Sequence, residues 1–342
     1  MNLGKFLEKA VVKSFKKIPV SLLQKATDAN ILIPYYHMVS DRDLPHVKHL
    51  YEYKNVKSVV DDLDFLGKKY SSITLQDLLD SLYRGRKLPG NAMLLTFDDG
   101  FREMHDVVAP LLLKKGIHAT FFVNTDFIDN HDMCYLNKAS ILADVLDKTY
   151  NSEIIEEIEG LLPFGKNENG KLKDLLLTIP YENRNVLDEI AEVLGIDFKK
   201  YLEDHRPYLT SGHIRKMIDH GFTFGAHSLD HPVYSSLPVN EQVKQTVESV
   251  SALRSRFSIK YGAFSFPHHD KNVTKSFFDE IFKGGMVDVT FGIDGFLNDS
   301  VMYNLQRVNL ERTLMPADYI IAKKYAQKIY FTIAGKANIE RV

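Results

Sequence analysis

The sequence predicts a mixed α/β protein with a helical insertion. Two observations support this prediction: short apolar runs that are typical of buried strands, and one long stretch, from about 130 to 207, in which apolar residues recur at helical spacing among many charges. Several of the apolar runs end in charged residues or histidines, which are the candidates for a functional site.

The composition is that of an ordinary globular protein. Of the 342 residues, 44% are hydrophobic and 26% are charged, and the formal net charge is -2, so the charge balance indicates no nucleic-acid partner. The length allows two domains, but polar motifs extend from residue 37 to beyond 267, which favours one domain that carries an insertion. The single cysteine, Cys134, excludes an internal disulfide bond and fits a reducing compartment.

Residues 1–30 predict a basic amphipathic helix, because apolar side chains recur at helical spacing between lysines. Such a helix either lies on an anionic membrane surface or packs on the rest of the protein with its lysines in water. The segment lacks the roughly 7 to 15 continuous apolar residues of a signal peptide, and no later segment is long enough to span a membrane. We therefore expect a cytoplasmic protein, peripheral at the inner face of the membrane if the helix binds lipid.

Two early apolar runs lead to residues capable of acid–base chemistry. Ile31–Ile33 leads to His37, and Ala92–Phe97 leads directly to Asp98 and Asp99. Two adjacent carboxylates at the end of a buried strand repel each other, and a bound cation or proton relieves the repulsion. An exposed Asp-Asp-Gly turn after a core strand is the alternative.

A second cluster supplies imidazoles. His227 and His231 follow the strand-like stretch 221–224, and their spacing of four residues allows two imidazoles to share one metal ion. Pro232 disfavours a regular helix, so we expect the pair on a loop. A structural or exposed role is the alternative for this pair alone. With Asp99, however, it makes a set of two histidines and one carboxylate, which suits zinc, cobalt or a similar divalent metal.

The insertion separates the second strand region from the histidines. Its charged helical pattern is clear in Asn151–Ile158 and Asn185–Ile190. A long excursion between strands whose ends carry the candidate site is expected near the rim of that site. It forms either a cap that narrows substrate access or a purely stabilising element.

These motifs resemble those of the polysaccharide deacetylases, the NodB-homology carbohydrate esterases. Thr96–Gly100 is similar to the first motif of the family, and His227–Pro232 is similar to the second. Tyr261–Pro267 resembles a relaxed third motif. The likeness covers residues 31–129 and 208 to about 312. It implies a distorted (β/α)7-type barrel over residues 31–342, with the insertion at about 130–207 and the site at the carboxyl ends of the strands.

The resemblance also implies roles for the matching residues. The residues that match the metal ligands are Asp99, His227 and His231. They would hold one divalent metal, with zinc as the first expectation and cobalt or nickel as alternatives. Asp98 would be the general base, because a metal of this kind polarises an amide carbonyl and lowers the pKa of bound water to about 7. The backbone amide after Pro267, that of His268, would help to hold the oxyanion.

A general acid is also needed, because an amide nitrogen leaves poorly unless it is protonated. The late histidine motif that supplies the acid in most of the family is absent, since no histidine follows His269. Pro34–Val39 resembles the branch that deacetylates poly-N-acetylglucosamine, in which the acid histidine comes early. We therefore expect His37 to be the acid, with a core histidine as the alternative.

Two further departures from the family pattern bear on the site. The third motif lacks its arginine, and Arg307 either orients Asp98 through a charge-assisted hydrogen bond or is a surface residue. The chain has no tryptophan to line an acetyl pocket. Phe291, Phe296 and Leu310 either line this pocket instead or belong to the core.

We therefore expect a metal-dependent hydrolase that removes an N-acetyl group from a sugar of a polysaccharide or glycan precursor. Two alternatives remain open. One is an O-acetyl esterase that acts on carbohydrate, because an ester needs less help from an acid. The other is a catalytically silent barrel that binds glycans. The intact base and ligand set favours an enzyme, whereas the altered third motif and the absent late motif favour the silent barrel.

Overall fold

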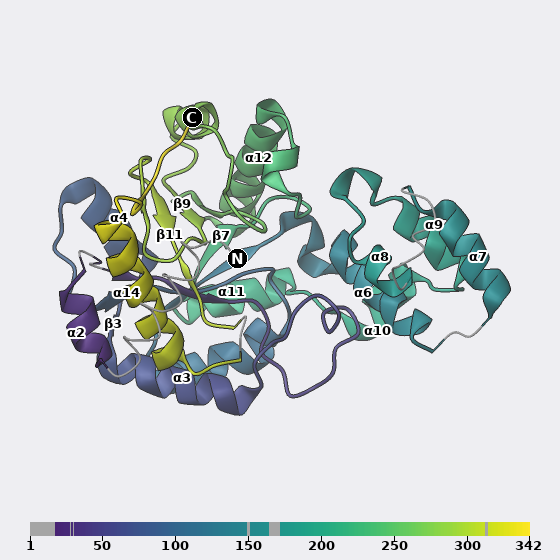
Figure 1. Cartoon of the computed structure of the whole chain (residues 1–342), viewed down its shortest axis with the longest axis horizontal. Coiled ribbons are helices and arrows are strands. Elements are labelled where there is room, and N and C mark those ends of the chain that lie inside the picture. The colour runs from purple at the N-terminus through teal and green to yellow at the C-terminus, as the bar shows by residue number, and fades with distance from the viewer. Residues whose placement is uncertain (1–17, 28, 30, 149–150, 164–171, 312–313) are drawn as a thin grey trace.

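The computed structural model describes residues 18–27, 29, 31–148, 151–163, 172–311 and 314–342, and it confirms the α/β fold class (Figure 1). At its centre lies a sheet of parallel strands in the order β11-β9-β8-β7-β6-β5-β2-β12. The strands are β2 (Pro34–Tyr36), β5 (Leu95–Phe97), β6 (Ala119–Val123), β7 (Thr223–Ala226), β8 (Ala263–Ser265), β9 (Val289–Gly292), β11 (Asn304–Gln306) and β12 (Val308–Asn309).

The sheet closes on itself through residues 304–309. β11 and β12, its two outermost strands, are separated in the chain only by Arg307. The Arg307 amide donates to the carbonyl of Gly292 in β9 (3.1 Å), and the Val308 amide donates to that of Ile33, next to β2 (2.8 Å). One bent segment therefore bridges both edges of the sheet. The result is a nearly closed parallel barrel, which confirms the predicted distorted (β/α) barrel.

Most barrel strands are largely apolar because side chains fill the interior while helices cover the outside. All residues of β5, β6 and β9 are buried. On the neighbouring strands β5 and β6, the ring of Phe97 stacks on that of Phe121, with centroids 5.2 Å apart. Because the strands are parallel, the residues that follow them meet at one end of the barrel.

Helices surround the barrel, and α3 and α14 lie side by side on one flank (Figure 1). These elements are α2 (Val20–Lys25), α3 (Val56–Lys69), α4 (Leu75–Arg84), the π-helical turn η2 (Met104–Val108), α5 (Ala109–Lys115), α11 (Ser211–Asp219), the 3-10 turn η5 (Tyr234–Ser236), α12 (Val239–Phe257), α13 (Lys275–Lys283) and α14 (Ala317–Ile333). Two small parallel sheets join β1 (Ile31–Leu32) and β3 (Ser71–Ser72) to β4 (Ala92–Met93), and β10 (Asn298–Asp299) to β13 (Asn338–Ile339).

The chain between β6 and α11 forms a group of helices to one side of the barrel (Figure 1). They are η3 (Thr125–Asn130), α6 (Tyr135–Leu146), α7 (Ser152–Leu161), α8 (Leu172–Leu176), η4 (Tyr181–Asn183), α9 (Val186–Val193) and α10 (Phe198–His205). They share an apolar core of their own, in which Leu142, Leu176 and Leu187 are fully buried. The same core includes Met38 and Phe101, which follow β2 and β5. The helices therefore pack against the carboxyl end of the barrel.

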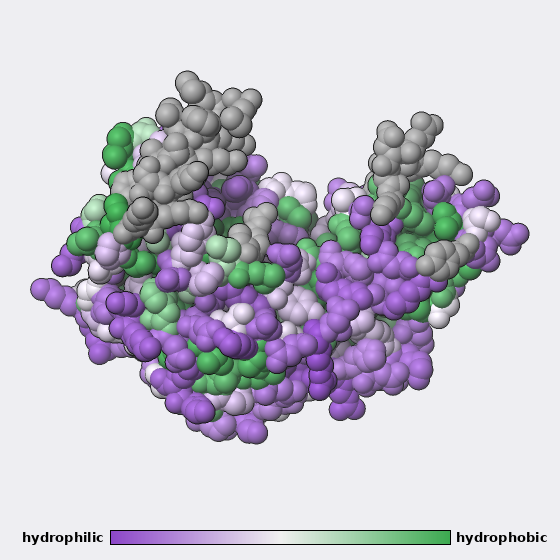
Figure 2. Space-filling model, turned by 60° about the horizontal axis from the view of Figure 1, so that its bottom comes forward, coloured by the Kyte–Doolittle hydropathy of each residue, from purple (hydrophilic) through white to green (hydrophobic). Residues whose placement is uncertain are grey.

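The amphipathic helix predicted over residues 1–30 lies largely outside the described residues. Within them, Val20–Lys25 forms α2, which packs on α14 and buries Leu23. Among the helices that the structure describes, none combines the length and the apolar character needed to cross a bilayer. The face seen in Figure 2 is largely hydrophilic, with hydrophobic side chains in separate groups.

Gly100 is required both by its backbone conformation and by its surroundings. Its φ is +68°, and a Cβ there would lie 2.9 Å from Cγ1 of Val123. Gly85, after α4, has a similar φ of +67°, but a Cβ there would meet no atom within 4 Å. The two glycines therefore share the backbone requirement and differ only in the space around them.

This difference predicts unequal costs of substitution by alanine. We expect Gly85→Ala to lower the free energy of unfolding by about 1 kcal/mol and Gly100→Ala by about 2–4 kcal/mol, because only the latter adds overpacking. Urea denaturation of both variants measures the two losses. If both variants lost the same free energy of unfolding, the contact of a Cβ at position 100 with Val123 would have no cost, and the prediction would be wrong.

Candidate functional site

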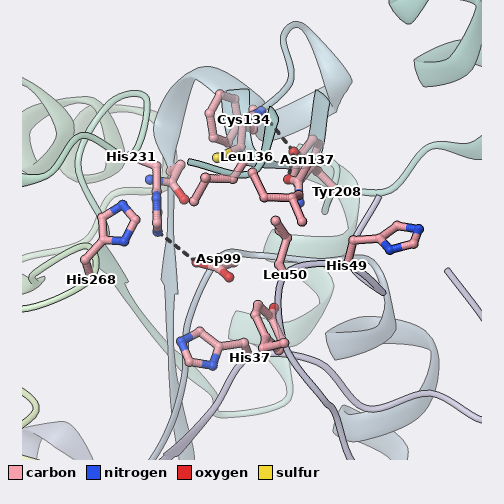
Figure 3. Close-up of a pocket in the computed structure, with 14 residues that line it drawn as sticks. His37, His49, Leu50, Asp99, Cys134, Leu136, Asn137, Tyr208, His231 and His268 are labelled. Atoms are coloured by element: carbon pink, nitrogen blue, oxygen red, sulfur yellow. Dashed lines mark hydrogen bonds and ion pairs between the residues drawn. The ribbon is translucent and has the colours of Figure 1, made fainter. Parts of the chain in front are cut away.

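The polar residues that follow the barrel strands converge at the carboxyl end of the barrel. Asp98 and Asp99 follow β5, His227 and His231 lie on the loop after β7, and His268 lies on the loop after β8. His37 approaches from the end of β2. Figure 3 shows His37, His231 and His268 arranged around Asp99. The loop position expected for the two histidines of the second motif is therefore confirmed.

Asp99, His227 and His231 form a compact cluster in which one potential ligand atom of each residue lies within 4.8 Å of the others. The Nε2 atoms of His227 and His231 lie 3.4 Å and 3.3 Å from Oδ1 of Asp99. Nδ1 of His227 lies 2.8 Å from the carbonyl oxygen of Ser265, which can only accept, so Nδ1 carries the proton. In the neutral ring the Nε2 lone pair therefore faces Asp99.

This donor set fits a divalent cation. Oδ1 of Asp99 is buried and has no hydrogen-bond partner among the described residues, although a buried carboxylate oxygen is normally paired. Two imidazole nitrogens and one carboxylate oxygen are the ligand types that zinc binds while keeping a position open. Burial by itself would raise the pKa of Asp99, but interactions with the protonated forms of His227 and His231 hold it well below its usual value, so the carboxylate is ionised.

The backbone around this cluster adopts conformations that are uncommon for residues other than glycine. Asp99, Ser228 and His231 have φ angles of 70°, 72° and 67°, in the left-handed region. Ser228 holds the histidine loop in this form, because its hydroxyl accepts a hydrogen bond from the His231 amide (2.9 Å) and another from Asn124 (3.3 Å). Such strained conformations persist where the surroundings fix them. Here they place the potential ligand atoms of the cluster close together.

Asp98 is buried against Arg307. Nη1 and Nη2 of Arg307 donate to the two carboxylate oxygens of Asp98, at 2.8 Å and 2.7 Å, and both side chains are almost completely shielded from solvent. Burial by itself would raise the pKa of Asp98, but the charge of Arg307, then that of His227, and the Arg307 hydrogen bonds lower it overall. Asp98 is therefore held ionised and in a fixed orientation.

The rest of the Arg307 guanidinium is also satisfied, which excludes the alternative of a surface arginine. Nη1 donates to the Thr96 hydroxyl (3.2 Å), Nη2 to the Ser265 hydroxyl (2.6 Å) and Nε to the Gly292 carbonyl (3.2 Å). The guanidinium lies over the ring of Tyr35, 4.5 Å from its centroid. The N–H groups of this buried guanidinium are therefore hydrogen-bonded on all sides, as a charge in the interior requires.

His37 is paired with Glu311, which follows β12. The Glu311 carboxylate accepts hydrogen bonds from the backbone amides of His37 (2.6 Å) and Met38 (3.3 Å), and it lies 3.2 Å from Nδ1 of His37. Burial by itself would lower the pKa of His37, but Glu311, with smaller contributions from Asp99 and Asp98, raises it to about 9. The imidazole is partly exposed, and it is protonated at neutral pH.

His268 lies beside the cluster, with its ring 4.7 Å from that of His231. Its φ is 57°, and the turn that holds it is closed by a hydrogen bond from the His269 amide to the Pro267 carbonyl (2.6 Å). Burial, and then the proximity of His231, lower the pKa of His268 to about 3, so its ring is neutral. The structure therefore brings Pro267 and His268 to the rim of the metal-type cluster.

A cavity of about 380 Å³ opens over the cluster. The barrel contributes Asp99, His231 and His268, together with His37 (Figure 3). The remaining lining comes largely from two other regions, the loop after β2 with His49, Leu50 and Tyr51, and the helical group with Cys134, Leu136, Asn137 and Leu177.

The residues considered for an acetyl pocket, Phe291, Phe296 and Leu310, are absent from the lining of this cavity. Phe291 and Leu310 are fully buried in the core, and Phe296 stacks on Tyr325. Of the two roles considered for these residues, packing is therefore the one that the structure supports.

Asp230 connects the helical group to the loop after β7, which carries His227 and His231. Its carboxylate accepts hydrogen bonds from the hydroxyl of Tyr181 in η4 (2.5 Å) and from Gln245 in α12 (2.9 Å), and Arg184 lies 3.7 Å away. Asp230 directly precedes His231. The helical wall of the cavity and one part of the cluster are therefore tied to each other.

Sequence reasoning missed several residues of the site. Glu311 gave a signal, because it follows a short strand as Asp98 does, but its partner lies 274 positions earlier. Ser265 gave none, since its contribution to His227 is a backbone carbonyl. Tyr51 and Asn137 lie in segments without a strand-end motif, so only the folded chain identifies them as lining residues.

Comparison with known proteins gives a family and a fold. A family model described as polysaccharide deacetylase matches residues 85–277, more than half of the chain. The Streptococcus pyogenes deacetylase PplD, solved in complex with acetate, is 14% identical, with a TM-score of 0.54 over 87% of this chain and 99% of that one. IcaB from Ammonifex degensii is 17% identical, with a TM-score of 0.54 over 88% of this chain and 98% of that one. At these identities the likeness concerns the fold. Among curated proteins, none matches the chain.

The buried pair of Asp98 and Arg307 generates a stability prediction. Arg307→Met leaves the Asp98 carboxylate buried without its partner, so we expect the free energy of unfolding at pH 7 to fall by about 3–5 kcal/mol. Adding Asp98→Asn to this variant should restore part of the loss, because the unpaired charge is removed. Chemical denaturation of both variants measures this.

The pH dependence of the same effect follows from the lowered pKa of Asp98 in the native protein. The ion pair stabilises the native protein fully at pH values above about 4, the pKa of an aspartate in the unfolded chain. This stabilisation disappears as the pH falls through the lower pKa that Asp98 has in the native protein. The gap between wild type and Arg307→Met should therefore shrink below about pH 4. A gap that stays constant with pH would rule out the ion pair as its source.

Proposed function

We propose that this chain, which belongs to the polysaccharide deacetylase family, is a metal-dependent hydrolase that removes the N-acetyl group from a sugar of a polysaccharide or glycan precursor. The observation that carries this proposal is the position of an ionised, oriented carboxylate, Asp98, directly beside a cluster of metal-type ligands. A site built in this way can activate water and attack an amide carbonyl in one place.

Asp99, His227 and His231 would hold one divalent cation, for which zinc suits the donor set best. When bound, such a cation supplies Lewis-acid polarisation of the amide carbonyl and a lower pKa for water. The protein's own contribution is the fixed donor arrangement. The carbonyl of Ser265 sets the tautomer of His227, and Ser228 sets the loop of His231.

Asp98 is the proposed general base. It accepts the proton of the attacking water while Arg307 keeps the carboxylate ionised and oriented through two hydrogen bonds. The arginine that the third motif lacks is thus supplied from the segment that closes the barrel. This contact argues against the catalytically silent barrel, whose main support was the altered third motif.

His37 is the proposed general acid. It donates a proton to the departing amide nitrogen, and Glu311 keeps the imidazole protonated at neutral pH. The backbone amide of His268 is the proposed donor to the oxyanion. An O-acetyl esterase has less need of an acid, so the pairing of His37 with a buried glutamate favours the amide substrate.

A role at the membrane surface remains part of the proposal. The lysines of residues 1–17, which lie outside the described residues, would contact an anionic membrane and bring the site to a lipid-linked glycan precursor. The cytoplasmic location expected from the sequence stays a prediction.

The ligand and base assignments predict opposite metal contents in two inactive variants. His231→Ala removes a ligand, so we expect it to lose bound metal and activity together. Asp98→Asn removes the base but no ligand, so it should retain about one metal ion per chain while kcat falls by a factor of at least about 10². Elemental analysis of the purified proteins and acetate release from N-acetylglucosamine oligosaccharides provide the two readouts. Full activity of Asp98→Asn, or stoichiometric metal in His231→Ala, would refute the respective role.

The role of His37 predicts a pH effect. An acid must be protonated to act, so activity should decline as the pH rises through the His37 pKa of about 9. Glu311→Gln removes the negative charge that raises this pKa, so the alkaline limb of kcat should move to lower pH, towards the ordinary histidine value of about 6.5. A pH–rate profile of both proteins tests this, and an unchanged alkaline limb in Glu311→Gln would exclude His37 as the acid.

A further inference from the structure

The cavity over the cluster contains one tyrosine whose hydroxyl is left without a partner. The hydroxyl oxygen of Tyr51 is buried, and none of the described residues forms a hydrogen bond with it. Tyr208, which lines the same cavity, differs in this respect. Its hydroxyl donates to Oδ1 of Asn137 (2.5 Å) and accepts from the Cys134 amide (3.1 Å). Because buried hydroxyls are normally paired, the Tyr51 hydroxyl is arranged for a group that enters the cavity.

The position of Tyr51 indicates which group this is. Its ring packs against that of His37, with centroids 5.2 Å apart, and it lines the cavity together with Asp99 and His231. An acetamido group undergoing hydrolysis must lie between the proposed acid and the metal ligands. Burial raises the pKa of Tyr51 well above its usual value, so the hydroxyl stays protonated and able to donate.

The loop that carries Tyr51 is fixed at its two ends. Val39 and Lys54 form a β-bridge, and the Ser40 amide donates to the Lys54 carbonyl (3.2 Å). The hydroxyl of Tyr53 closes the loop internally by donating to the Arg42 carbonyl (2.8 Å). The backbone that carries Tyr51 is therefore restrained, which limits the positions that its hydroxyl can adopt.

Helix α6 of the helical group holds the middle of the same loop. Ser140 donates to the Pro45 carbonyl (2.6 Å), and Asn137 donates to the His46 carbonyl (2.7 Å). The Ser140 hydroxyl also accepts from the His49 amide (3.3 Å), two residues before Tyr51. A donor that is positioned in advance loses little freedom when it binds, which is the condition for a strong effect on the transition state.

We propose that Tyr51 is a further catalytic residue, whose hydroxyl donates a hydrogen bond to the acetamido oxygen of the substrate as negative charge develops on it, and that Ser140 of α6 is a positioning residue for it. The proton stays on the tyrosine throughout, so no bond to it is made or broken. This inference rests on the proposed function. It also assigns the helical group a part in the chemistry, in addition to forming a wall of the cavity.

The test compares Tyr51→Phe with Tyr208→Phe in the full chain loaded with zinc, using an N-acetylglucosamine oligosaccharide and acetate release. Tyr51→Phe removes no hydrogen bond within the protein, so its Tm should equal or exceed that of wild type, whereas its kcat should fall about 10- to 100-fold with KM changed less than about twofold. Tyr208→Phe removes two internal hydrogen bonds, so its Tm should fall. A wild-type kcat in Tyr51→Phe would overturn the proposal. So would a lowered kcat in Tyr51→Phe if the Tm of this variant fell as far as that of Tyr208→Phe, because the loss would then be structural.

The positioning role of Ser140 is tested by a double-mutant cycle. Ser140→Ala should lower kcat in the wild-type background but have little further effect in the Tyr51→Phe background, because the group that it positions is already missing. Additive losses would overturn the role of Ser140. Failure of the proposed function is distinguishable from both results, since it would appear as a zinc-loaded wild type that releases no acetate, which would overturn this inference as well.

Discussion

The buried ion pair between Arg307 and Asp98 is the interaction on which both the fold and the site depend. Arg307 lies at the bend where one segment pairs with both edges of the sheet, so closure of the barrel carries its guanidinium to the end of β5. Neither charge is stable in the interior without the other. Closure of the barrel therefore stabilises the ionised, oriented form of Asp98, and this is the state that a general base requires.

At this end of the barrel, the pKa values of two titratable groups are shifted in opposite directions. Arg307 lowers the pKa of Asp98, whereas Glu311 raises that of His37. A carboxylate that stays ionised and an imidazole that stays protonated over the same pH range divide the work of base and acid between them. Arg307 and Glu311 are four residues apart and lie on either side of β12. One short segment thus sets both protonation states.

The helical group contributes to the site through its attachments. Asp230 ties η4 to the histidine loop, and α6 ties down the loop after β2. The cavity is consequently bounded by three regions that are distant in sequence but hydrogen-bonded to one another. A wall fixed in this way limits the motion of the residues it carries, which agrees with a site that depends on donors positioned in advance.

Local signals in the sequence were enough to predict the α/β class, the helical stretch and the polar residues that follow the strands, because strand and helix periodicity and ligand spacing are short-range properties. Asp98 and the Asp99 cluster were recognisable in this way. By contrast, the sequence left Arg307 open between a partner of Asp98 and a surface residue, and only the folded chain decides for the contact. The pairing of Glu311 with His37 and the unpartnered hydroxyl of Tyr51 became visible only in the folded chain. These features depend on which distant segments meet when the barrel closes. Such meetings set the protonation state of a buried charge and the pairing of a buried hydroxyl, and no local pattern encodes them.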